Sequence, residues 1–228
     1  MRFGPIAAAL VLAAAASPAL AQNVPDQPAG AAPAPSANPV ERFQAYVQLD
    51  GYKSMLSQMA TVGETVSAPE CKEHKAVSHT IMAVFVPPAF ADGLHPIQGV
   101  WLDRAVMQRC GIEVFQNVLF QAQAADKPPA AALLLPGATA TIPPKQAEVM
   151  KDVLDGLAKK NCSDQSQIIP VNTKRDKEIK PLKIDEKGKV VEGAWKETWT
   201  LKACGKTVNA TVDLTADGKG GLAHKVKL

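Results

Sequence analysis

The amino-acid sequence predicts an exported α+β protein of two tandem repeats, each a helix followed by an antiparallel β-meander and each closed by one disulfide. Three observations predict this fold class: an export signal at the start, four cysteines in the rest of the chain, and an internal repeat. The segment GVWLDRAVMQRCGIEV, residues 99–114, is echoed by GAWKETWTLKACGKTV, residues 193–208. In both segments a Trp stands two residues after a Gly, and a Cys-Gly pair begins nine residues after the Trp.

The first 21 residues, MRFGPIAAALVLAAAASPALA, predict a cleaved signal peptide. Arg2 precedes an apolar run, and Ala19-Leu20-Ala21 supplies the small residues that a signal peptidase requires. A membrane anchor is the alternative, but the run over 6–16 is shorter than the roughly 20 residues that span a bilayer. We expect cleavage after Ala21, no later transmembrane segment, and, from the alanine-rich composition, a periplasmic location.

Residues 22–40, QNVPDQPAGAAPAPSANPV, predict a Pro/Ala-rich disordered linker. The segment holds five Pro and five Ala and almost no large apolar side chains. Such a composition buries too little surface to offset the entropy lost on ordering, and favours a solvated, partly polyproline-II spacer. The remaining chain divides into repeat 1 at 41–142 and repeat 2 at 143–228.

Each repeat is expected to begin with a helix. The stretch 38–62 offers Asn38 as a cap, followed by apolar residues at helical spacing: Phe43, Tyr46, Val47, Met55, Leu56 and Met59. The stretch 142–162 offers Pro144 in an early turn, followed by Val149, Met150, Val153, Leu154 and Leu157. One helix packed on an antiparallel meander defines an α+β module.

Alternating apolar residues predict the strands that follow each helix. In repeat 2, Trp195, Trp199 and Leu201 share one face, and the chain turns near Gly205 into a second alternating run. The sequence DGKGG at 217–221 makes the next turn, and 222–228 forms the last strand. In repeat 1 the corresponding strands are expected at 98–109, 112–123 and 130–141. The layout resembles cystatin-like or NTF2-like folds, and this fold-level analogy implies no function.

The four cysteines are expected to form disulfides because an even number of Cys in an exported chain is typical of a disulfide framework. Three pairings are open, and the repeat chooses among them. Shifting repeat 1 by 94 residues aligns Cys110 with Cys204, and each has one Cys upstream, 39 and 42 residues away. The simplest pairing is Cys71–Cys110 and Cys162–Cys204.

The candidate binding residues occupy the same positions in both repeats: Trp101, Asp103, Trp195 and Glu197. The alternation places both carboxylates on the face that packs, where a charge is costly unless it is paired. One interpretation puts each acid at a strand edge or beside a Lys or Arg. The other makes it a polar ligand contact on a concave face.

No catalytic or cofactor motif is found. The chain has no G-x-S-x-G, H-E-x-x-H or C-x-x-C sequence. Cys71-x-x-His74 could ligate a metal only if the cysteine were reduced, and Asp213 with Asp217 lacks the regular spacing of a calcium loop. We therefore predict no metal, no cofactor and no catalytic residue.

The charge distribution gives a weak indication of partners. From Asn172 onward there are 13 Lys and Arg against 8 Asp and Glu, whereas residues 41–171 hold 11 against 13. The basic C-terminal third is a candidate for contact with an anionic partner or envelope surface, but a solvated sheet face is the favoured interpretation. No basic-aromatic motif suggests nucleic acid.

The last 36 residues, 193–228, resemble the C-terminal part of small secreted proteobacterial proteins of unknown function. The shared features are the Trp, the Cys-Gly pair and the D-G-x-G-G turn, present here as DGKGG. The resemblance covers about one sixth of the chain, and implies an exported compartment and a fold but no activity.

The sequence thus predicts an exported, periplasmic, non-catalytic binding or accessory protein, whose partner is an envelope protein or a small ligand. One alternative is an enzyme of unrecognised type that uses carboxylates in a groove between the repeats. Another is a structural component of the cell envelope.

Overall fold

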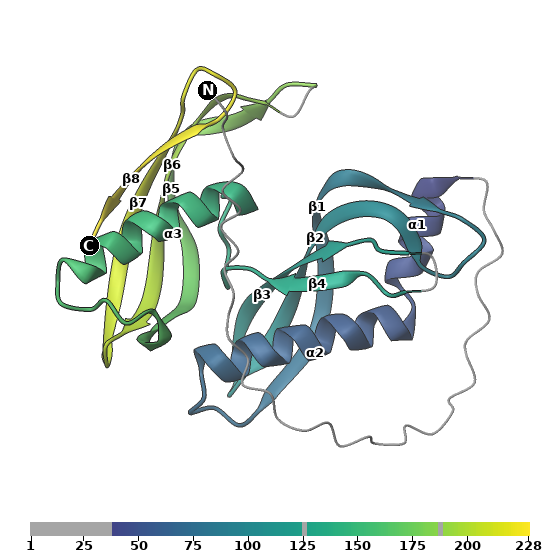
Figure 1. The fold of residues 1–228 in the computed structure, drawn as a ribbon, viewed down its shortest axis with the longest axis horizontal. Coiled ribbons are helices and arrows are strands. Elements are labelled where there is room, and N and C mark those ends of the chain that lie inside the picture. The colour runs from purple at the N-terminus through teal and green to yellow at the C-terminus, as the bar shows by residue number, and fades with distance from the viewer. Residues whose placement is uncertain (1–37, 125–126, 187–188) are drawn as a thin grey trace, which may run out of the picture. The chain divides into compact units, whose positions relative to one another are not determined.

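The computed structural model of the protein describes residues 38–124, 127–186 and 189–228. Within these ranges the chain forms three α-helices and two four-stranded antiparallel sheets (Figure 1). The predicted signal peptide at 1–21 and the linker up to residue 37 lie outside the described residues. The elements are, in order, α1 Pro39–Val47, α2 Asp50–Ser67, β1 His74–Phe90, β2 Pro96–Arg109, β3 Ile112–Gln121, β4 Ala130–Leu133, α3 Pro143–Ala158, the 3-10 turn Gln165–Gln167, β5 Ile168–Ile184, β6 Val190–Ala203, β7 Lys206–Ala216 and β8 Leu222–Lys227.

The first predicted helix forms as two helices, α1 and α2. Helix α1 begins at Pro39, directly after the predicted cap, so the last two residues of the linker predicted at 22–40 are helical. Asn38 caps α1, because its side chain accepts a hydrogen bond of 3.0 Å from the N–H of Val40. Helix α1 ends at Val47 with Gln48 as its C-cap, and Leu49, in extended conformation, precedes α2 without a side-chain cap. Because of this break, the two helices bury two separate sets of apolar side chains. Helix α1 buries Phe43 and Tyr46, and α2 buries a stripe of residues that begins at Tyr52.

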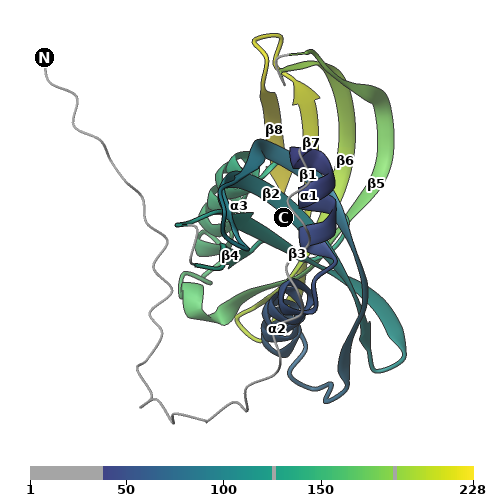
Figure 2. The same ribbon diagram turned by 90° about the vertical axis from the view of Figure 1, so that its right-hand side faces the viewer.

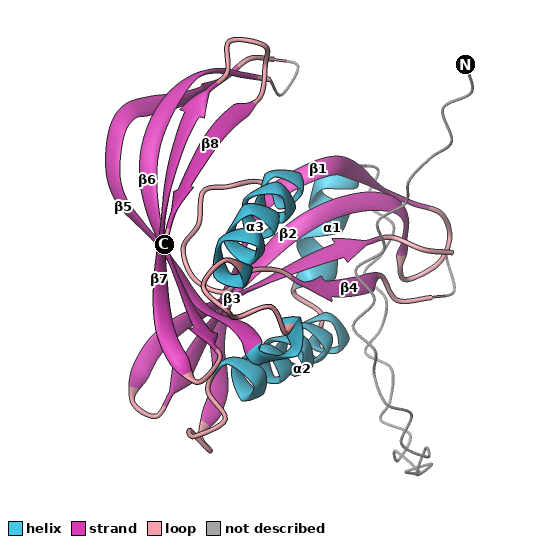
Figure 3. Ribbon diagram, turned by 60° about the vertical axis from the view of Figure 1, so that its left-hand side comes forward, coloured by secondary structure: helices cyan, strands magenta, loops and turns pink. Residues whose placement is uncertain are grey.

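The first sheet has the strand order β1-β2-β3-β4, and the second has β5-β6-β7-β8 (Figure 2). Helix α2 lies across one face of the first sheet, and α3 lies across one face of the second (Figure 3). Each sheet therefore has its own core, built on Trp101 and Phe120 in the first and on Trp195, Trp199 and Leu214 in the second. This arrangement confirms the mixed α+β class.

The two sheets share one strand register. His79 pairs with Ala105 in the first sheet, and Thr173 pairs with Trp199 in the second, each 94 residues later. The same shift relates every register irregularity of the β1–β2 ladder to one of the β5–β6 ladder. The first, between residues 76 and 78, matches the one between 170 and 172, and the last, between 89 and 90, matches the one between 183 and 184. Because bulges fix the bend and twist of a strand, the two ladders curve in the same way.

Both central hairpins turn on a Cys-Gly pair. Cys110 and Gly111 have φ of 44° and 83°, and Cys204 and Gly205 have 47° and 74°. Two consecutive residues with positive φ make the tight turn whose twist matches that of antiparallel strands. Disulfides join Cys71 to Cys110 and Cys162 to Cys204, the pairs expected from the sequence. Closing loops of this size stabilises a fold by about 4 kcal/mol each.

The strand predicted at 130–141 is mostly wrong, because β4 ends at Leu133. The following residues, 134–142, form an extended linker segment that leaves the first sheet and reaches the second. Its N–H groups at Leu134 and Gly137 donate to Asn117 and Phe115 of β3, both at 2.9 Å. Its N–H at Ala138 donates to the carbonyl of Thr173 on β5 at 2.7 Å. The linker segment is thus hydrogen-bonded to both sheets.

None of the helices in the described part of the chain combines the length and the apolarity needed to cross a membrane.

Candidate functional site

Asp103 is fully buried on β2, an interior strand, and its hydrogen-bond partners are a tyrosine hydroxyl and an imidazole. The hydroxyl of Tyr52 donates to Oδ2 at 2.8 Å, and Nδ1 of His79 lies 2.9 Å from the same oxygen. The indole N–H of Trp101 donates to the Tyr52 hydroxyl at 3.0 Å. Burial and the neighbouring carboxylate raise the pKa of Tyr52 far above its usual value, so this hydroxyl keeps its proton. The other oxygen, Oδ1, is buried without a hydrogen-bond partner among the described residues.

The interpretation that the two acids lie at strand edges or beside a Lys or Arg is therefore wrong for Asp103. It is also wrong for Glu197, which is fully buried on the interior strand β6. Alternation in the sequence correctly assigned both side chains to the packed face. It could not show that hydroxyl, imidazole, indole and backbone donors, none of them Lys or Arg, would surround the carboxylates.

Glu197 accepts five hydrogen bonds. The indole N–H groups of Trp195 and Trp199 donate to Oε1 and Oε2, both at 2.8 Å. The Thr139 hydroxyl donates to Oε2 at 2.7 Å, and the Ala140 N–H and Thr141 hydroxyl donate to Oε1 at 2.9 and 3.2 Å. Three of the five donors belong to the linker segment, so this carboxylate fastens that segment to the second sheet.

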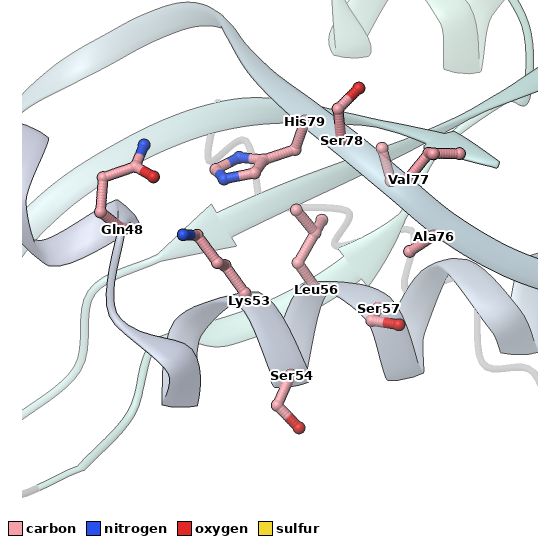
Figure 4. A pocket seen from close by; sticks show the side chains of 10 residues that line it. Gln48, Lys53, Ser54, Leu56, Ser57, Ala76, Val77, Ser78 and His79 are labelled. Carbon is pink, nitrogen blue, oxygen red and sulfur yellow. The ribbon is translucent and has the colours of Figure 1, made fainter. Parts of the chain in front are cut away.

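A groove of about 570 Å³ opens between the first half of α2 and strand β1 (Figure 4). Gln48, Lys53 and His79 extend into the same space at one end of it. No carboxylate lines it, and Lys53 forms no ion pair within the described ranges. The volume is in the range of pockets that bind ligands. The lining residues are Gln48, Lys53, Ser54, Leu56, Ser57, Ala76, Val77, Ser78, His79 and Ala105.

One of the residues that line the groove is small and fully buried. Ala105 lines it, and the residue at the same register position of the second sheet is Trp199. The Trp199 indole is 1% exposed, packs in the second core and donates to Glu197. The second sheet thus has a large buried side chain at the register position where the first sheet has a small buried one.

A third buried acid, Glu64 of α2, was not singled out from the sequence. Its Oε1 accepts hydrogen bonds from Arg109 Nη2 at 2.9 Å and from Gln116 Nε2 at 2.6 Å, and its Oε2 accepts one from Arg109 Nε. The signal was available, because Glu64 continues at intervals of four the buried stripe of Tyr52, Leu56 and Ala60. Arg109 immediately precedes Cys110, so this pair ties α2 to the disulfide-linked turn and serves the fold.

The predicted binding residues Trp101 and Trp195 are fully buried in their cores, so neither indole lines the groove surface. Asp217, considered for calcium, accepts backbone hydrogen bonds from Lys219 and Gly221, which lower the pKa of its carboxyl group. Within the described ranges no group of three or more His, Cys, Asp and Glu side chains could hold a metal ion.

The basic C-terminal third is partly neutralised by its own acids. Lys180 and Lys183 lie 2.9 and 2.7 Å from the carboxylate of Glu192, and they lower its pKa to about 2. Lys196 pairs with Asp213 at 3.0 Å. Contact of this region with an anionic surface stays a prediction.

Comparisons with protein-family models, with curated proteins and with solved structures found no match. The resemblance to small secreted proteobacterial proteins and the cystatin-like or NTF2-like analogy therefore stay predictions.

Proposed function

We propose that the protein is an exported, non-catalytic binding protein built from two copies of one disulfide-closed module, of which the first copy binds a ligand in the groove between α2 and β1. Three features support the repeat: the shared register and bulges, the Cys-Gly turns and the disulfides. The linker segment belongs with the second copy, because its residues supply donors to Glu197. These contacts support a module boundary near residue 134 in place of the one expected at 142.

The disulfides support export, because such bonds form and persist in oxidising compartments. Together with the signal sequence they favour the periplasm, with cleavage after Ala21. The fold is consistent with a soluble accessory protein that meets its ligand in that compartment.

The observation that carries the proposal is the contrast between residues 105 and 199. One module fills its interior with Trp199 and uses both oxygens of Glu197 for its own chain. The other leaves a groove above Ala105, and one oxygen of Asp103 has no partner among the described residues. A stability role alone gives no reason for that difference, since a large side chain at residue 105 would add buried apolar surface.

A catalytic function is the second candidate, because the His79–Asp103 hydrogen bond is the arrangement that orients a general base. Binding is favoured over it for two reasons. No serine hydroxyl of the groove hydrogen-bonds to His79 in the described structure. The two repeat carboxylates, predicted as a possible catalytic pair, have no hydrogen-bond partner in common.

Site-specific photo-crosslinking in the native envelope tests the proposal. A photoreactive phenylalanine analogue at Val77, which is 55% exposed and lines the groove, should give a discrete crosslinked product. The matched control is the same analogue at Val191, which is also 55% exposed but lies on β6.

The product formed from Val77 should disappear when Ala105→Trp fills the groove. Equal products from both positions, or none from Val77, would favour the structural envelope component instead.

A further inference from the structure

We infer that the ligand of the groove is an extended polypeptide segment that adds to the free edge of β1, as residues 136–141 of this chain add to the second sheet. The inference rests on the proposed function and specifies its ligand class.

The linker segment of the second module lies against the edge strand β5. Ala138 N–H donates to the Thr173 carbonyl at 2.7 Å, and the Thr173 hydroxyl donates to the Pro136 carbonyl at 2.7 Å. Gly137 faces the same residue so closely that an added Cβ would lie 2.3 Å from both the backbone N and the O of Thr173. The backbone of Thr173 therefore points outward and is covered by an extended segment.

The corresponding residue of the first module is His79. It pairs with Ala105 in the same register in which Thr173 pairs with Trp199, so its backbone groups point to the outer edge of β1. No backbone hydrogen bond joins this edge to another described segment. The described residues before α2 form helix α1 here, and they supply no extended segment for this edge.

The groove lies directly beside this edge, since four consecutive residues of β1, 76–79, line it. An added strand would form main-chain hydrogen bonds with β1, and alternate side chains would enter the groove above Ala105. Main-chain pairing combined with a side-chain groove is a recurrent mode of peptide recognition. Gln48 and Lys53, at one end, are suited to carbonyl or carboxylate oxygens of the peptide.

The charges on the two edge strands support this assignment independently. Seven of the ten residues from Lys174 through Lys183 on β5 are charged, and charged edges discourage strand addition. The matching part of β1, residues 80–89, contains no Lys, Arg, Asp or Glu. Met82, Val84 and Phe85 are each more than 40% exposed there. The edge of β1 thus carries no charged residue over the stretch where the edge of β5 is densely charged.

The test is an amide NMR titration of the full exported chain with the synthetic peptide LLPGATATI, the sequence of residues 134–142. We expect saturable shifts at the amides of residues 76–80. A control peptide with Ala in place of its Gly should bind about tenfold more weakly or worse, because the added Cβ meets the strand backbone. The Ala105→Trp variant should lose the shifts, whereas Ala223→Trp, an exposed matched change on β8, should keep them.

Val77→Lys gives a second variant that does not depend on core packing, and it should also weaken binding about tenfold by placing charge on the edge. Shifts confined to residues 138–140 and 172–174 would mean that the peptide only displaces the linker segment, and would overturn the inference. No shift in β1 at millimolar peptide would do the same. If the Val77 crosslink persists in that case, the groove binds another class of ligand and the proposed function stands; if both fail, both are wrong.

Discussion

Replacing Glu197 with Gln should destabilise the protein by about 3 kcal/mol, and the size follows from the five donors around the carboxylate. An amide nitrogen must take the place of one oxygen. At Oε1 it would meet two donors that cannot rotate, the Trp195 indole and the Ala140 N–H. At Oε2 it would meet the Trp199 indole and the Thr139 hydroxyl. This hydroxyl can rotate and accept a hydrogen bond from the amide nitrogen. The amide nitrogen should therefore replace Oε2.

That orientation leaves one buried indole unpaired, which costs about 1–3 kcal/mol. The three hydrogen bonds to the remaining oxygen lose their charge assistance, about 1 kcal/mol each. Relief from burying a charge offsets part of the loss, by about 2 kcal/mol. Asp103→Asn is the matched control, because its carbonyl can keep the contacts of Oδ2 while the amide nitrogen takes the unpartnered position. We expect it to cost less than about 1 kcal/mol.

Urea unfolding followed by tryptophan fluorescence measures both changes, since all three Trp are buried. Equal midpoints for the two variants at unchanged m-value would refute the reasoning. It would mean that Glu197 is not held by the linker segment and that the two acids are equivalent.

Three further predictions follow from the structure. Gly137→Ala should cost about 2–4 kcal/mol in the same assay, because φ is 98° and the added Cβ would lie 2.3 Å from backbone atoms. Gly205→Ala is the control and should cost about 1 kcal/mol, because its φ is 74° but no atom lies within 4 Å of the added Cβ. Equal losses would contradict the close approach at Gly137. Burial lowers the pKa of His95, so the unfolded chain binds a proton at this residue more readily than the folded chain. The free energy of unfolding should therefore fall on acidification from about pH 7.5 to about pH 5.5, and it should fall less in His95→Gln. An unchanged pH dependence of stability in the variant would exclude this residue as the cause. A fragment of residues 134–228 should unfold at higher urea than one of residues 143–228, which lacks the donors of Glu197, and identical midpoints would restore the boundary at 142.

The sequence predicts the strands and disulfides well where the pattern is local. Alternation around Trp195 sets the face that packs, and the Cys-Gly pairs mark the two hairpin turns. The shift of 94 residues then fixes which cysteines belong together. Each of these inferences depends on contacts between residues close in sequence or related by the repeat.

The site was predicted only in part. Alternation places Asp103 inward but does not reveal Tyr52 and His79, which come from a helix and another strand. The groove depends on a difference between the repeats, Ala105 against Trp199, whereas the sequence argument used only their similarities. The linker segment continues the apolar pattern of β4, so its departure to the second sheet depends on tertiary contacts that no periodicity contains.

Amide hydrogen exchange on the free, full exported chain tests the central claim most directly: one module is filled by its own chain and the other is open. We predict that the amides of Ala138 and Ala140, which donate to Thr173 and Glu197, exchange as slowly as those of the second sheet. The outward amide of His79 should exchange rapidly. Fast exchange at Ala138 and Ala140 together with protection at His79 would contradict the account, because the linker segment would then be loose and the β1 edge already covered.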